Sequence, residues 1–214
     1  MSPGAGRLAH GLYLLTPDMA DTARLLARVA AVLPARPAAI QYRNKCLDPA
    51  ARAAQGAALR ARCREAGVRF IVNDDLALAL ALEADGVHLG KDDGDLAAAR
   101  RAIGAGRCLG VSCYGAWARA EAAVAAGADY VAFGAMFPSP TKPAAVAADA
   151  GLLSRARAAF DVGVVAIGGI TLHNAPALVS AGATQLAVIS DVFDAPDPLA
   201  RARAYARLFA AKLS

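Results

Sequence analysis

Residues 69–93 read RFIVNDDLALALALEADGVHLGKDD and contain a strand, a helix and a second strand in that order. The first apolar run stops at Asn73 and Asp74, and the second, residues 86–89, stops shortly before Asp93. Two parallel strands joined by a helix end at the same edge of one sheet. The spacing therefore predicts that Asp74 and Asp93 lie together in a mouth lined by loops.

Two carboxylates that converge in this way repel each other unless a positive group lies between them. A hard divalent cation is the simplest such group, so Asp74 and Asp93 are candidate metal ligands. Each residue alone also has an ordinary explanation, with Asp74 as the N-cap of the following helix and Asp93 as a solvated loop residue. The metal site gains support because polar strand ends recur along the whole chain.

The alternation of apolar strands and alanine-rich helices continues from one end to the other. Strands are predicted at residues 11–15, 38–43, 69–72, 86–89, 107–111, 129–134, 163–167 and 184–189. Helices are predicted at residues 21–33, 49–66, 75–84, 95–103, 115–126, 149–159, 172–181 and 197–211. Eight such units in 214 residues predict an α/β protein with a single (β/α)8 TIM barrel. An open, doubly wound sheet is the alternative, but no Gly-x-Gly-x-x-Gly turn follows the first strand.

The composition fits one barrel domain over residues 1–214, with residues 1–8 expected to be a flexible N-terminal segment. No apolar run reaches the roughly 20 residues of a membrane span, and no secretory signal is visible, so we expect a cytoplasmic protein without a membrane partner. The net charge of +5 is spread over helix surfaces, which argues against a nucleic-acid partner. An alanine-rich exterior suits either solvent or a second copy, so a homo-oligomer stays open.

Cations follow the second predicted strand, which ends in QYRNK at residues 41–45. Alternation along a barrel strand sends Gln41, Arg43 and Lys45 toward the same side. Near the mouth, an arginine fork and a lysine point charge suit a polyanion. The alternative is that both cations extend into solvent.

The remaining strand ends add hydroxyl groups, one more cation and glycines. Ser112 follows strand 107–111, and the proline-rich loop PSPTKP at residues 138–143 presents Lys142. Gly168-Gly169 and Ile189-Ser190 end the last two strands, where barrels commonly bind phosphate. His88 is interpreted as a packed residue. With no nucleophile–base pair evident, the set suits metal-assisted loss of pyrophosphate from one substrate and capture by a second, phosphorylated one.

These residues carry a resemblance to a known family. The motifs are QYRNK (41–45), VNDD (72–75), ADGVHLGKDD (84–93), LGVSCY (109–114), GADYVAFGAMFPSPTKP (127–143), VVAIGGI (164–170) and AVIS (187–190). In this order and at this spacing, the chain resembles the thiamine-phosphate synthase family. The resemblance implies a transferase of thiamine biosynthesis. Such an enzyme joins 4-amino-2-methyl-5-hydroxymethylpyrimidine diphosphate to 4-methyl-5-(2-phosphoethyl)thiazole and releases pyrophosphate, with Mg²⁺ as cofactor.

The resemblance also implies roles for residues at matching positions. Asp74 and Asp93 would ligate Mg²⁺. The pyrimidine diphosphate would be held by Gln41, Tyr42, Arg43, Asn44, Lys45, Asn73, Ser112 and Lys142. The thiazole phosphate would contact Ser139, Pro140, Thr141, Gly169, Ile189 and Ser190. Arg43, Lys45, Ser112 and Lys142 would act in catalysis as pyrophosphate departs in a dissociative step.

Some positions depart from the commoner pattern of the family. They are Tyr42, Asn44, Asp75, Lys91 and Ser139. Asp75 and Asn44 suggest a rewired contact at the rim, while the diphosphate, metal and phosphate groups stay intact. A thiazole tautomerase-like paralogue and a non-catalytic barrel that binds thiamine phosphate are the alternatives. Both are disfavoured, because neither needs two carboxylates beside three cations.

Overall fold

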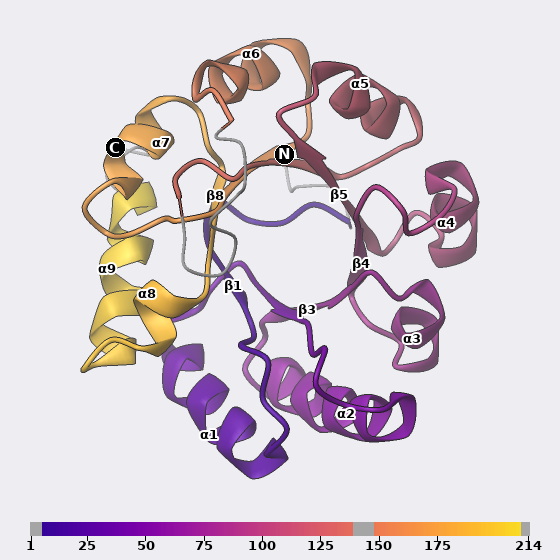
Figure 1. Ribbon diagram of the computed structural model, residues 1–214, viewed down its shortest axis with the longest axis vertical. Coiled ribbons are helices and arrows are strands. Elements are labelled where there is room, and N and C mark those ends of the chain that lie inside the picture. Colours follow the sequence, from indigo (N-terminus) through magenta and orange to yellow (C-terminus); the bar gives the residue numbers. More distant parts are fainter. Residues whose placement is uncertain (1–5, 139–147, 211–214) are drawn as a thin grey trace.

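Eight parallel strands close into a barrel, and the helices surround it (Figure 1). The structure is a computed structural model that describes residues 6–138 and 148–210. The strands are β1 (Gly11–Leu15), β2 (Ala39–Tyr42), β3 (Arg69–Asn73), β4 (Gly86–Leu89), β5 (Cys108–Tyr114), β6 (Tyr130–Phe133), β7 (Gly163–Ile167) and β8 (Gln185–Val188). Each strand pairs with its neighbours in sequence, and β8 closes the barrel on β1. The predicted (β/α)8 TIM barrel is confirmed.

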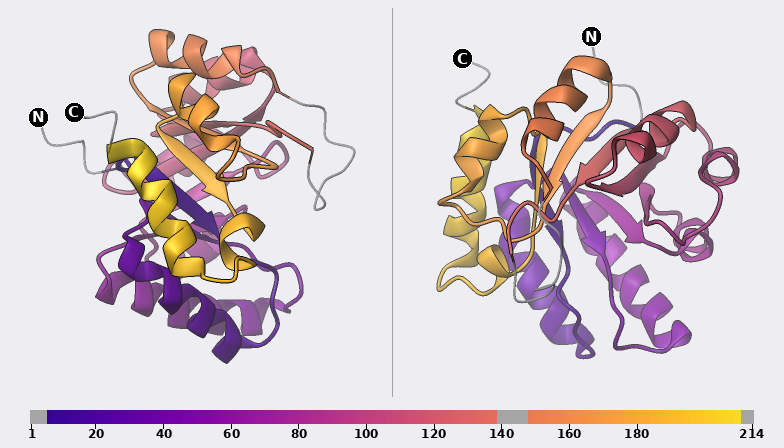
Figure 2. Two further views of the ribbon diagram at one scale, coloured as in Figure 1. Left: turned by 90° about the vertical axis from the view of Figure 1, so that its left-hand side faces the viewer. Right: turned by 45° about the horizontal axis from the view of Figure 1, so that its top comes forward.

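The helices follow the strands in the predicted order. They are α1 (Thr22–Val32), α2 (Pro49–Glu65), α3 (Leu76–Ala81), α4 (Leu96–Ile103), α5 (Trp117–Ala125), α6 (Gly151–Ala159), α7 (Ala175–Ser180), α8 (Ser190–Phe193) and α9 (Pro198–Ala210), with a 3₁₀ turn η1 at Leu33–Ala35. The turn η1 and the short helix α8 were not predicted. Both further views show the helices on the outside of the barrel (Figure 2). No helix among the described residues combines the length and apolar character of a membrane span.

Side chains separate into two buried layers because successive residues of a strand point to opposite faces. The larger apolar cluster lies between the strands and the helices and includes Leu12, Ile40, Phe70 and Val87. A smaller cluster fills the barrel interior. It contains Leu8, Tyr13, Leu15, Ala39, Ile71, Cys108, Tyr130, Ala132, Val165 and Ala187. Leu8, which the sequence assigned to a flexible segment, is therefore buried at the barrel floor, whereas residues 1–5 lie outside the described residues.

The floor of the barrel is fixed by a polar residue just before each of the strands β4, β6 and β8. These residues are Asp85, Asp129 and Thr184. The side chain of each accepts a hydrogen bond from a backbone N–H of the preceding strand, at 2.7–2.8 Å. The backbone N–H of each donates to the same strand, at 2.8–2.9 Å. These repeated contacts set the register from below and leave the opposite, carboxyl ends of the strands to form the site.

Candidate functional site

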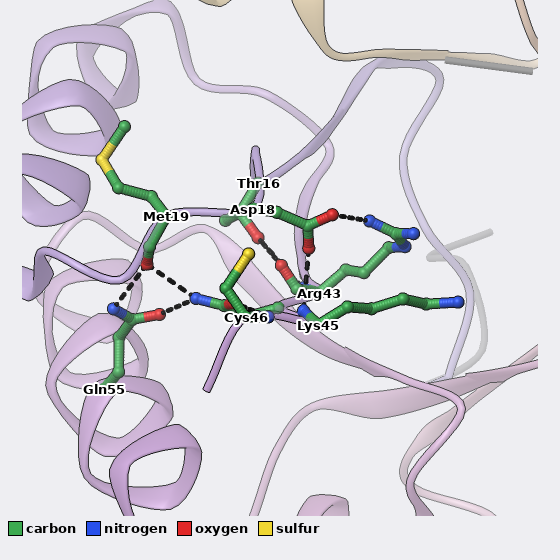
Figure 3. A network of polar contacts seen from close by, with 8 residues as sticks. Thr16, Asp18, Met19, Arg43, Lys45, Cys46 and Gln55 are labelled. Carbon is green, nitrogen blue, oxygen red and sulfur yellow. Dashed lines mark hydrogen bonds and ion pairs between the residues drawn. The ribbon is translucent and has the colours of Figure 1, made fainter. Parts of the chain in front are cut away.

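The loop after β2 carries the cations, and Asp18 from the loop after β1 holds that loop in place. The carboxylate of Asp18 accepts from the Arg43 guanidinium at 2.6 Å and from the Lys45 backbone N–H at 2.8 Å. The Thr16 hydroxyl group exchanges two hydrogen bonds with the Arg43 backbone, at 2.8 and 2.9 Å. The Arg43 and Lys45 side chains extend to the same side (Figure 3). Two cations are thus presented together at the mouth.

Asp18 and Thr16 were missed in the sequence. Reading the end of the first strand, Thr16-Pro17-Asp18, by the rule used for the other strands would have found them.

Two neighbours of Arg43 direct their polar groups toward α2 and Met19. The Asn44 amide donates to the Met19 carbonyl and to Gln55, both at 2.7 Å, and Asn44 is only 4% exposed. The Tyr42 hydroxyl group donates to the Arg52 carbonyl at 3.0 Å and lies 3.1 Å from Gln55. In Figure 3, Met19 and Gln55 lie on the side opposite to the end of the Lys45 side chain. The structure therefore uses the polar groups of Tyr42 and Asn44 to join the loop to α2, and both residues also line the cavity beside Arg43.

Asp74 and Asp93 come together as the spacing predicted. The pKa of Asp74 is raised to about 6, first because its carboxyl group loses hydration and then through a hydrogen bond and charge repulsion with Asp93. Asp74 has a left-handed backbone (φ 63°), and its N–H donates to the His88 carbonyl at 2.8 Å. One oxygen of Asp93 accepts from the Gly90 N–H at 2.6 Å. The turn and the loop together hold two acidic groups at one place.

The N-cap of α3 is Asp75 and not Asp74. Its carboxylate accepts from the Leu78 N–H at 2.8 Å and pairs with Arg52 at 2.7 Å. Asp75 and Asn44 therefore do not form one shared contact at the rim. Asp75 pairs with Arg52 of α2, and Asn44 bonds to Gln55 of the same helix. Asp74 is left without a capping role and free to face Asp93.

The carboxylate pair fits a Mg²⁺ site. No group of three or more histidine, cysteine, aspartate or glutamate residues occurs among residues 6–138 and 148–210. Mg²⁺ typically uses one or two carboxylates and completes its shell with water and substrate phosphate oxygens. A cavity of about 340 Å³ is lined by Asp74 of this pair, together with Arg43, Lys45, Asn73 and others. A diphosphate bound there would face cations and carboxylates together.

Ser112 lies at the rim on β5 and is held from two directions. Its hydroxyl group is 2.8 Å from Nε2 of His88. Its carbonyl accepts from Arg119 of α5 at 2.6 Å, and the same guanidinium donates to the Gly90 carbonyl at 2.6 Å. Arg119 thus joins Ser112 to the loop that carries Asp93. His88 itself is buried, as the sequence indicated, and burial lowers its pKa to about 4, so its imidazole is neutral.

The loops after β7 and β8 form a second group on the other side of the mouth. Gly169 has a left-handed backbone (φ 61°), and a Cβ there would lie 2.5 Å from the Pro138 carbonyl oxygen. The Gly169 carbonyl accepts from the Asn174 amide at 3.0 Å. Glycine is thus needed for the close approach of the loop after β6. Ser139, Pro140, Thr141 and Lys142 of that loop lie outside the described residues.

Asp191, which the sequence did not single out as a site residue, connects this group. Its carboxylate accepts from the Leu172 N–H of the β7–α7 loop at 3.2 Å. It also pairs with Arg201 at 3.0 Å and accepts from the Tyr205 hydroxyl group at 2.7 Å, both on α9. Asp191 directly follows Ile189 and Ser190. It therefore ties the turns after β7 and β8 to one helix.

Comparisons with known proteins agree with the sequence motifs. Residues 12–192 match the family described as thiamine monophosphate synthase. The chain is 65% identical to a thiamine-phosphate synthase of Azoarcus sp. (strain BH72), over 96% of this chain and 100% of that protein. It is 63% identical to one of Aromatoleum aromaticum, over 94% and 96% of the two chains. The solved structure of thiamine phosphate pyrophosphorylase from Pyrococcus furiosus superposes with a TM-score of 0.82 at 31% identity, over 95% and 97% of the two chains.

Proposed function

Because the chain belongs to the thiamine monophosphate synthase family and is a thiamine-phosphate-forming transferase, we propose that its two loop groups divide the two substrates between them. The reaction joins the pyrimidine diphosphate to the thiazole phosphate and releases pyrophosphate. In the proposal, the loops after β2 to β5, together with Lys142 of the loop after β6, hold the diphosphate. The other named residues of the loops after β6 to β8 hold the thiazole phosphate. The observation that carries it is the grouping of Arg43, Lys45 and Asp74 around one cavity, with Asp93 next to Asp74.

Asp74 and Asp93 would hold Mg²⁺ against the diphosphate. A bound Mg²⁺ neutralises charge on the departing pyrophosphate. Arg43 and Lys45, with Lys142 as the sequence predicts it, would act on the same developing charge and would stabilise the transition state more than the bound substrate. Loss of pyrophosphate leaves a pyrimidine-methyl cation, which the thiazole nitrogen captures. The free thiols of Cys46, Cys63, Cys108 and Cys113 suit the reducing cytosol that we propose as the location.

Binding and turnover together test this assignment. Isothermal titration with the pyrimidine diphosphate is expected to show tighter binding with Mg²⁺ than without it. Thiamine phosphate and pyrophosphate should then form when thiazole phosphate is added. Diphosphate binding that is indifferent to Mg²⁺ would contradict the metal assignment, and binding without product would favour the non-catalytic alternative.

The raised pKa of Asp74 gives a pH prediction for the metal-free protein. Its carboxyl group should titrate near pH 6, and added Mg²⁺ should lower this midpoint because the ion stabilises the charged form. A raised carboxyl pKa costs folding stability above pH 6, and this cost is removed progressively as the pH falls from about 6 to about 3.8. Carbon-13 NMR of the aspartate carboxyl groups measures the midpoint. Asp93→Asn should lower it, and a wild-type midpoint near 3.8 would contradict the prediction.

Asp191→Ala should raise KM for the thiazole phosphate about 10-fold, because a loss of one or two hydrogen bonds loosens both turns. KM for the pyrimidine diphosphate should stay unchanged. Asp194→Ala is the matched control, since Asp194 also pairs with an arginine, Arg28, at the other end of α8. Equal increases in both KM values would instead indicate a general disturbance of the barrel.

A further inference from the structure

A continuous chain of hydrogen bonds crosses the barrel interior below the mouth. It links five side chains on five strands, in the order Gln41, Tyr13, Tyr130, His88 and Ser112. The four successive distances are 2.9, 2.7, 2.8 and 2.8 Å. Gln41, Tyr13 and Tyr130 are at most 2% exposed and His88 is 6% exposed, so only Ser112 reaches the rim.

The surrounding packing holds the rings of this chain in place. The His88 and Tyr130 rings stack at 5.5 Å between centroids, and the Tyr13 and Tyr130 rings meet edge to face at 5.7 Å. Gly110 leaves room for the Tyr130 ring, because a Cβ there would lie 1.9 Å from Tyr130 Cζ. The packing of the core therefore fixes the positions of the residues in this hydrogen-bond chain.

The protons of this chain can be ordered from its buried end. The Gln41 amide nitrogen faces Tyr13 and can only donate. The Tyr13 hydroxyl proton is then donated to Tyr130, whose own proton is donated to Nδ1 of His88. The opposite order would bring two donors onto the Tyr13 oxygen and leave its proton without an acceptor in the interior. A neutral imidazole that accepts at Nδ1 carries its proton on Nε2, which donates to the Ser112 oxygen.

We propose that this interior chain fixes Ser112 as a hydrogen-bond donor toward the pyrimidine diphosphate, with His88 and Tyr130 as positioning residues. Because the Ser112 oxygen accepts from His88, its own proton is left to point into the mouth, where an anionic oxygen is the matching acceptor. With the chain reversed, Ser112 would donate to His88 and present lone pairs to the substrate. The inference rests on the proposed role of Ser112 in binding the diphosphate.

The tautomer of His88 tests the chain without any substrate. Nitrogen-15 NMR of histidine-labelled protein should show His88 protonated on Nε2, and comparison with His88→Gln assigns its signal among the three histidines. A wild-type His88 protonated on Nδ1 would overturn the proposal. This measurement is independent of the proposed substrate sites, so its outcome stands even if those sites are assigned wrongly.

A double-mutant cycle tests whether the chain acts through Ser112. Tyr130→Phe should lower kcat/KM for the pyrimidine diphosphate about 10-fold, the equivalent of one hydrogen bond, and leave KM for the thiazole phosphate unchanged. In a Ser112→Ala background the same substitution should have almost no further effect. Equal effects in both backgrounds would mean that Tyr130 has only a structural role. No effect of Ser112→Ala alone would overturn both the proposal and the binding role of Ser112.

Three further substitutions separate positioning from stability. Thr184→Val removes another buried barrel hydroxyl group, bonded to Val164 at the floor, and should leave both KM values unchanged. His88→Gln keeps an amide N–H that can donate to Ser112, whereas His88→Leu has no donor. His88→Gln is therefore expected to retain most of kcat/KM, and His88→Leu to lose as much as Ser112→Ala. Equal losses in the two His88 variants would contradict the positioning role even if Tyr130→Phe failed to fold.

Discussion

Asp93→Ala is expected to lower kcat by on the order of 10³, because charge stabilisation of several kcal/mol by the metal is lost at the leaving group. The pKa of Asp74 is raised to about 6, first by burial and then by the hydrogen bond and charge of Asp93. Removing one of the two acidic groups should return the pKa of the other toward its usual value. It should also weaken Mg²⁺ binding, as measured by titration calorimetry on the variant.

Asp92→Ala is the matched control for this prediction. Asp92 is the exposed neighbour of Asp93 in the same loop, and it should be replaceable with little effect on turnover. Full activity of Asp93→Ala at low Mg²⁺ would show that this carboxylate is not a metal ligand. Because Mg²⁺ binding is measured separately, a loss of turnover with unchanged metal affinity would point to a different role for Asp93.

Arg43→Ala should lower kcat/KM for the pyrimidine diphosphate by about 10²-fold, the effect of removing one preorganised donor to developing charge. Asp18 binds one terminal nitrogen of the guanidinium, and Thr16 fixes the backbone behind it. The remaining donors of the fork are therefore oriented before the substrate arrives. Arg43→Lys should lower kcat/KM almost as much as Arg43→Ala, since lysine keeps the charge without the planar fork.

Steady-state kinetics with separate kcat and KM values measure the role of Arg43. If the cation acts on the departing pyrophosphate, kcat should fall by a larger factor than KM rises. A change in KM alone would make Arg43 a binding residue only. Arg24→Ala, which removes an exposed arginine from α1, serves as the control for a loss of one positive charge.

The barrel was predictable from sequence because each strand and helix is specified by a short, continuous stretch of residues. Continuous apolar runs are expected for strands buried on both faces, and each run was followed by a helix. The glycines that end three helices, Gly67, Gly127 and Gly182, have the left-handed backbone that is typical of glycine after a helix. The predicted strand ends differ from the observed ones where the tertiary structure extends a strand. Strand β5 continues to Tyr114 through a bulge, three residues past the predicted end.

The convergence of Asp74 and Asp93 was also predictable, since the order of parallel strands places consecutive strand ends at one edge. The sequence alone could not say which side chains at the strand ends direct their polar groups away from the mouth. Tyr42 and Asn44 stand among cations in the sequence, yet their hydrogen bonds are made with α2 and with Met19. Asp18 became part of the site because β1 and β2 are neighbours in the closed barrel, where its carboxylate reaches Arg43.

The sequence by itself determined the barrel, the family and the residue types at each strand end, because these depend on periodicity and on the order of elements along the chain. Only the tertiary structure decided the contacts between side chains from different strands. The chain from Gln41 to Ser112 joins residues up to 117 positions apart, and no spacing rule connects them. Closure of the barrel brings their inward faces within hydrogen-bonding distance, and burial favours hydrogen bonds among these polar groups.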